Sequence, residues 1–148
     1  MKKVEIHAAC VEKQQAKLDE LQNAINKVQE SIVGEENSTA GNKFETARAM
    51  GQEELDRLNL TMNNAIKEMN ILRQIDPNKP CGYVQLGALV STDKKTMYLS
   101  VGIGKIEIGK ETLFAISKSS PIGQQLMGLE KGGTVSFAGK KETIKNIS

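Results

Sequence analysis

The chain has 148 residues, of which 39% are hydrophobic and 26% charged, and its formal net charge is +2. This length allows one ordinary domain or two small ones, each with a modest core. Cys10 and Cys81 show no CxxC spacing, and no stretch approaches the roughly 18 apolar residues of a membrane span, so the composition argues against a disulfide scaffold, a zinc ribbon and a membrane protein. Residues 1–30 contain no apolar leader, and we expect a cytoplasmic protein with reduced thiols.

Charge is unevenly distributed along the chain. Residues 1–76 contain ten Lys and Arg against thirteen Asp and Glu, whereas residues 77–148 contain ten Lys against five acids. A mildly basic second half can face an acidic partner surface or nucleic acid. We expect most of this charge to be solvated surface.

The first predicted element is a helix over about residues 6–33. Its apolar residues follow one another at spacings of three, four or seven positions, which keeps them on one side of a helix. They are Val11, Leu18, Leu21, Ile25, Val28 and Ile32. Residues 34–42, here named the tip segment, are rich in residues that favour caps and turns, so we expect the helix to break there.

The same period returns over about residues 43–74 and predicts a second long helix. Two such helices joined by a short loop bury their apolar stripes against each other. We therefore predict an antiparallel helical hairpin, a coiled coil. The residues expected in its buried seam are Leu21, Ile25, Leu58 and Met62.

Asp76-Pro77-Asn78-Lys79-Pro80 ends the second helix, because proline cannot continue it. We place a domain boundary here, with the hairpin in residues 1–76 and a second domain in residues 77–148. The second domain is β-favouring, with strand candidates at 83–90, 96–101, 113–116, 134–137 and 141–147. One short helix is expected over residues 121–129. The predicted fold class is α+β, with an antiparallel sheet packed against that helix.

Common catalytic and metal-binding signals are missing from the sequence. No Walker, HExxH or GxSxG motif occurs, and Gly102-Ile103-Gly104 has Glu107 where a dinucleotide loop needs a third glycine. The single histidine, His7, has no partners for metal or triad chemistry in its neighbourhood, and we expect it to be an exposed polar residue near a frayed terminus. We therefore expect neither an enzyme nor a metal site.

The segment from Ile116 to Val135 contains a specific motif, Ser120-Pro121-Ile122-Gly123. Ser120 and Pro121 can start a helix at its N-cap and first position, and Gly128 can close it. This segment resembles the stretch of the Gre transcript-cleavage factors in which a strand enters Ser-Pro-Leu-Gly, followed by a short helix ending in Leu-Leu-Gly. The helical hairpin and the total length also fit that family.

The resemblance implies a bacterial transcription elongation factor that is not itself an enzyme. Its FKBP-like C-terminal domain would grip the rim of the RNA polymerase secondary channel while the coiled coil enters it. We expect a monomer that meets DNA and RNA only within the transcription complex. The candidate polymerase contacts, acting directly or by shaping the docking surface, are Ser119, Ser120, Pro121, Ile122 and Gly123. The alternative is that these residues only cap the helix.

In the Gre family, two acidic residues at the hairpin tip help to hold Mg²⁺ at the polymerase active centre. The resemblance maps these two positions onto Asn37 and Ala40, which are neutral, so the tip is divergent. Glu35 and Glu36 are the remaining acidic candidates, and they can equally be solvated carboxylates. We expect no intrinsic cofactor, Mg²⁺ only if shared with the polymerase, and weak transcript cleavage.

Two other functions compete with this interpretation. The FKBP-like fold that the resemblance implies suggests a peptidyl-prolyl isomerase, although a fold does not confer an activity. An isomerase pocket is lined by aromatic residues, and the second half offers only Tyr83, Tyr98, Phe114 and Phe137. The other alternative is a coiled-coil adaptor unrelated to transcription.

Overall fold

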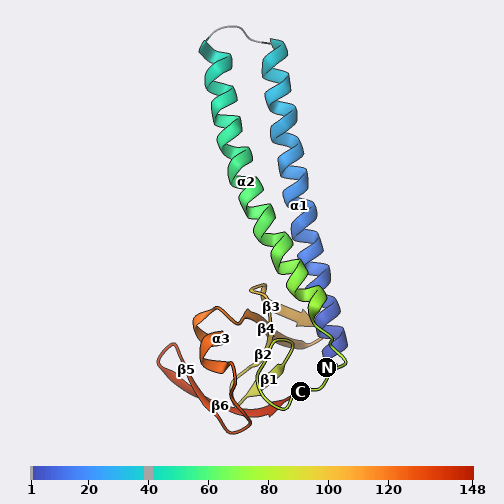
Figure 1. Cartoon of the computed structure of the whole chain (residues 1–148), viewed down its shortest axis with the longest axis vertical. Coiled ribbons are helices and arrows are strands. Elements are labelled where there is room, and N and C mark those ends of the chain that lie inside the picture. The colour runs from blue at the N-terminus through green and yellow to red at the C-terminus, as the bar shows by residue number, and fades with distance from the viewer. Residues whose placement is uncertain (1, 39–41) are drawn as a thin grey trace. The chain divides into compact units, whose positions relative to one another are not determined.

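The structure, a computed structural model, describes residues 2–38 and 42–148; residues 1 and 39–41, and the side chains of residues 35–44, lie outside that description. Two long helices precede a six-stranded mixed sheet and a short helix, so the α+β class is confirmed (Figure 1). The elements in chain order are α1 (Lys3–Ser38), α2 (Asn42–Gln74), β1 (Leu89–Thr92), β2 (Thr96–Ser100), β3 (Gly104–Ile108), β4 (Glu111–Ser117), α3 (Pro121–Leu126), β5 (Thr134–Phe137) and β6 (Lys140–Ile147).

The chain forms two compact units. The hairpin unit is Gln14–Glu68, and the sheet unit combines Met1–Lys13 with Met69–Ser148. The first turns of α1 therefore belong to the unit that holds the sheet. The division predicted between residues 76 and 77 stays a prediction; α2 ends two residues before it.

In the hairpin unit, α1 and α2 lie side by side and antiparallel (Figure 1). Ile25 of α1 is buried with Leu55 and Leu58 of α2. At the start of the hairpin unit, the buried side-chain amide of Gln14 donates a hydrogen bond of 2.9 Å to the Ala65 carbonyl of α2. The predicted seam is found, with Leu21 and Met62 partly rather than fully buried.

Both helices differ from the predicted ranges at the tip segment. The break predicted at Gly34 is wrong, because α1 continues through it to Ser38. A glycine inside a helix costs only about 1 kcal/mol relative to alanine, so one glycine does not end a helix that is long and regular.

The sheet has the strand order β3-β4-β2-β1-β6-β5. The expectation of a purely antiparallel sheet is wrong, since β2 and β4 pair in parallel while the other neighbours are antiparallel. The cause is β3, a strand that the sequence pattern did not predict. It forms a hairpin with β4 and occupies the sheet edge, so β4 returns beside β2 in the same direction as β2.

Two elements of the sheet unit have other bounds than the sequence predicts. Residues 83–88, predicted as part of the first strand, form turns, and β1 begins at Leu89. The short helix ends at Leu126 instead of residue 129. Gly128 has φ +85°, which is not a helical conformation. Its N–H donates to the Val84 carbonyl at 2.8 Å, so it pairs with the loop before β1 instead of extending α3.

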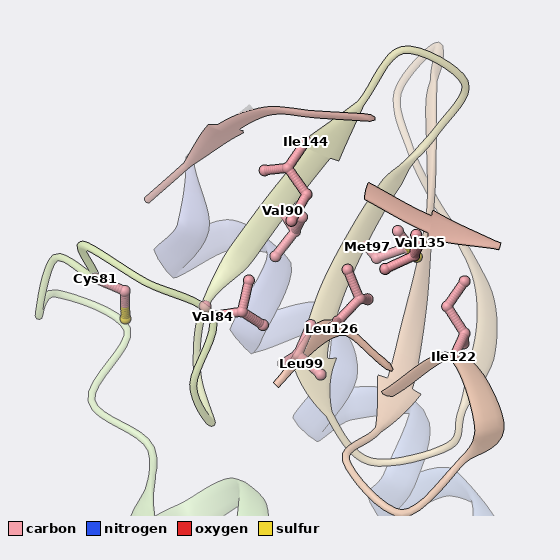
Figure 2. Packing of buried hydrophobic residues seen from close by; sticks show 10 residues of the cluster. Cys81, Val84, Val90, Met97, Leu99, Ile122, Leu126, Val135 and Ile144 are labelled. Atoms are coloured by element: carbon pink, nitrogen blue, oxygen red, sulfur yellow. The ribbon is translucent and has the colours of Figure 1, made fainter. Parts of the chain in front are cut away.

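One face of the sheet packs against α3. Ile122 and Leu126 of α3 point toward strand residues that include Met97 and Leu99 (Figure 2). The Ile122 side chain is 7% exposed and Leu126 is completely buried. This apolar cluster fixes α3, and with it the Ser-Pro motif, on the sheet. The buried cluster consists of Cys81, Val84, Ala88, Val90, Met97, Leu99, Ile122, Leu126, Val135 and Ile144.

Within the sheet unit, polar contacts join the first turns of α1 to the segments that follow α2. The His7 Nδ1 lies 2.8 Å from the Tyr98 hydroxyl, and the Lys3 Nζ donates to the Lys79 carbonyl at 2.8 Å. Ile6 and Cys10 are fully buried. The expectation of an exposed His7 on a frayed terminus is therefore wrong, because an apolar face of α1 packs here and brings the imidazole with it.

Candidate functional site

The Ser-Pro motif lies at the junction between β4 and α3. Ser120 has the extended backbone of an N-cap, and its hydroxyl accepts a hydrogen bond from the Gly123 N–H at 3.1 Å. The same hydroxyl donates to the Ser117 carbonyl at the end of β4, at 2.6 Å. Pro121 follows at the first helical position, where the missing N–H costs nothing. Ser120 thus fixes the angle between strand and helix.

Gly123 is required by this junction for steric reasons. A Cβ atom at this position would lie 2.0 Å from the Ser117 carbonyl oxygen and 3.0 Å from the Lys118 Cα. Both are backbone atoms, which cannot move aside without moving β4 or α3. The glycine of the motif therefore permits close contact between the helix and the end of the strand.

The five residues proposed as polymerase contacts separate into two groups. Ile122 and Gly123 are buried, and Ser120 is half-buried with its hydroxyl bonded within the chain. Ser119 and Pro121 are exposed. A partner can therefore touch Ser119 and Pro121 directly, while the other three residues hold them in position.

Ser119 is itself held by short-range contacts. Its hydroxyl lies 2.7 Å from the Ser117 hydroxyl, and its N–H donates to that same hydroxyl at 3.1 Å. Its carbonyl accepts from the Gln124 side-chain amide at 3.0 Å. The exposed surface formed by Ser119, Pro121 and Gln124 is therefore preorganised, which lowers the entropy lost on binding. Sequence reasoning missed Gln124.

Gln125 has a structural role that sequence reasoning also missed. Its side-chain amide donates to the Ser136 carbonyl at 2.8 Å and accepts from the Ser136 N–H at 2.9 Å. Ser136 lies on β5, one of the two edge strands of the sheet. Gln125 thus occupies backbone groups of that edge, where an unpaired strand would otherwise be open to another chain.

The acidic and neutral candidates of the tip segment fall at the edge of the described residues. Glu35, Glu36 and Asn37 belong to α1, and their side chains lie outside the described residues, as does Ala40 entirely. Within residues 2–38 and 42–148, no group of three or more His, Cys, Asp or Glu is placed to hold a metal ion.

An open groove lies near the tip in the hairpin unit, between α1 and α2. A Cβ at Gly51 would lie 2.7 Å from the Ile32 Cγ1, so the glycine lets the two helices approach closely. Met50 beside it is 66% exposed. The groove is lined by Lys27, Val28, Ser31, Ile32, Ala47, Met50, Gly51 and Glu54.

The buried titratable groups of the sheet unit are poorly suited to catalysis. Burial raises the pKa of the Cys10 thiol to about 11, so this thiol is protonated at neutral pH and is a weak nucleophile. Burial also raises the pKa of the Tyr98 hydroxyl. Cys10 lies on α1 and Tyr98 on β2, and both groups serve the packing between the first turns of α1 and the sheet.

In the described part of the chain, no helix combines the length and apolar content needed to cross a membrane. The chain matches no protein-family model, and no curated protein has a significantly similar sequence.

Proposed function

We propose that this protein is a Gre-like transcription factor that binds RNA polymerase at the secondary channel and modulates elongation. The observation that carries the proposal is the Ser120-Pro121-Ile122-Gly123 junction at the end of β4, the feature on which the resemblance to the Gre factors rests most specifically. The hairpin unit supports it, since such a factor needs a long helical pair to enter a narrow channel.

The docking surface in this proposal is the exposed group Ser119, Pro121 and Gln124. These residues stand on a frame fixed by the Ser120 cap, by the close contact at Gly123 and by the burial of Ile122. Rigid exposed residues on a packed scaffold favour specific recognition, because little conformational freedom is lost on binding.

We further propose that the factor stimulates transcript cleavage only weakly. Cleavage at the polymerase centre needs a second metal ion, and a protein that delivers it must supply carboxylate ligands. The amide of Asn37 offers one neutral oxygen, and Ala40 offers no ligand. The protein thus occupies the channel without supplying the usual metal ligands.

Binding of the full-length chain to core RNA polymerase tests this function. We expect a stable complex in a pull-down or by size exclusion, and a loss of affinity of at least about tenfold for Ser119→Arg, since an arginine adds bulk and charge at the centre of the docking surface. Thr112→Arg, exposed on β4, is the matched control and should bind like the wild type. Absence of wild-type binding would refute polymerase docking. Equal binding by both variants would move the docking surface elsewhere.

A further inference from the structure

The open groove between α1 and α2 leaves apolar side chains in contact with solvent. Met50 of α2 is 66% exposed, and Val28 and Ile32 of α1 are only half-buried. The groove has a volume of about 440 Å³, and its apolar lining residues are Val28, Ile32, Ala47 and Met50. Exposed apolar residues that gather at a groove with a polar rim are typical of a surface that another protein covers.

The two rims of the groove carry charges of opposite sign. Lys27 lines the groove from α1, and Glu54 lines it from α2. Lys27 is exposed and forms no ion pair within 4.0 Å among the residues that the structure describes. The Glu54 carboxylate pairs with Arg57, three residues further along α2. Since a carboxylate has about four acceptor positions, this pair leaves room for a second cation.

A groove with opposite charges on its two rims is complementary to a second copy of itself. When a two-fold axis runs parallel to the helices, α1 of one copy faces α2 of the other at the same height along the hairpin. Lys27 of each copy then faces Glu54 of the other copy, and Met50 of each copy faces the Val28 and Ile32 of the other.

The alternative two-fold arrangement does not pair these charges. If the axis crosses the helices at right angles and the two grooves still coincide, α1 faces α1, so that Lys27 meets the Lys27 of the other copy. Like charges in direct opposition disfavour an interface. The rim charges therefore select a parallel pair of hairpins, which has the arrangement of a four-helix bundle.

We propose that a second copy of this chain covers the groove, so that two hairpins associate in parallel as a weak dimer. The balance of one cation against one anion at the rims favours neither a strongly acidic nor a strongly basic partner, whereas it fits an identical surface turned by half a rotation. The inference replaces the monomer expected from the family resemblance. It does not depend on polymerase docking, because it concerns the free protein.

Sedimentation equilibrium of the full-length chain, over concentrations from about 5 to about 200 µM, tests the apolar part of the interface. The wild type should form dimers within this range. Met50→Ser should weaken dimerisation at least about tenfold, because the symmetry removes two apolar contacts at once. Leu60→Ser is the matched control, since Leu60 lies on the same helix, is 65% exposed and is not a lining residue of the groove. It should dimerise like the wild type.

Charge reversal tests the arrangement. Lys27→Glu and Glu54→Lys should each weaken dimerisation at least about tenfold, because each puts like charges together on both sides of the axis. The double variant that combines them should dimerise within about threefold of the wild type, since opposite charges face each other again. An equimolar mixture of the two single variants should also form dimers, because every contact across the axis then joins a glutamate to a lysine.

Three results would overturn the proposal. One is a wild-type chain that stays monomeric at about 200 µM. Another is a dimer that Met50→Ser and Leu60→Ser weaken equally, which would place the interface away from the groove. The third is a dimer that the single charge reversals leave unchanged, or that the double variant fails to restore, which would exclude the parallel arrangement. No polymerase is present in these measurements, so their failure leaves the proposed function to its own test.

Discussion

The His7 Nδ1 and the Tyr98 hydroxyl lie 2.8 Å apart, although the two residues are 91 positions apart in the chain. The ring centroids are 6.1 Å apart in an edge-to-face arrangement. This contact joins the first turns of α1 to β2 in the middle of the sheet. Because burial removes water from the imidazole, the pKa of His7 is lowered from its ordinary value of 6.5.

The first prediction concerns pH and stability. A histidine whose pKa is lower in the folded state binds fewer protons there than in the unfolded chain, so its contribution to stability is complete above pH 6.5 and declines as the pH falls through the range below 6.5. Chemical unfolding at about pH 7.5 and about pH 5.5 should show this loss. His7 is the one histidine of the chain, so His7→Gln should remove the part of the pH dependence that histidine contributes below pH 6.5. If the free energy of unfolding of the variant falls between these two pH values as much as that of the wild type, the loss comes from carboxylates and not from His7.

The second prediction concerns the hairpin seam. Leu58 is 6% exposed and packs with Ile25 and Leu55, so Leu58→Asp places a charge in an apolar layer. We expect the free energy of unfolding to fall by about 3 to 5 kcal/mol. Leu60→Asp is the matched control, because Leu60 lies on the same helix but is 65% exposed, and it should change stability by less than about 1 kcal/mol. Similar stabilities for both variants would contradict the packing of α1 against α2.

The third prediction concerns the β4–α3 junction. Gly123→Ala puts a methyl group 2.0 Å from the Ser117 carbonyl oxygen, so either β4 or α3 must shift. We expect a loss of about 2 to 4 kcal/mol in denaturant unfolding. Gly82→Ala is the matched control, because Gly82 lies in the same unit and has open space for the added methyl group. The free energy of unfolding of this variant should stay within about 0.5 kcal/mol of the wild type. A fully stable Gly123→Ala protein would mean that the glycine of the motif is not needed for the fold.

The fourth prediction concerns the tip and rests on the proposed function. With backtracked elongation complexes, Asn37→Asp combined with Ala40→Glu should raise transcript cleavage, because it restores carboxylates at the positions to which the resemblance assigns metal ligands. Glu35→Ala combined with Glu36→Ala should leave the wild-type rate nearly unchanged. Strong wild-type cleavage that disappears in the Glu35/Glu36 variant would instead show that the acidic pair has moved along the tip segment.

The sequence by itself determined the elements whose signals are local. The apolar period that places Ile25 and Leu58 on one seam predicts two helices over many turns, since each turn repeats the same pattern. The Ser120 cap and Pro121 likewise act within a few residues, so the start of α3 could be predicted to the residue. Gly123 was visible as part of the motif, but its role in the close contact of α3 with β4 required the position of the Ser117 carbonyl.

The tertiary structure decided whatever depends on partners far apart in the chain. Strand β3 is short, and its pairing with β4 makes the sheet mixed, which no local pattern encodes. The contact of His7 with Tyr98 and the ion pair of Glu142 with Lys95 arise only when separate segments meet.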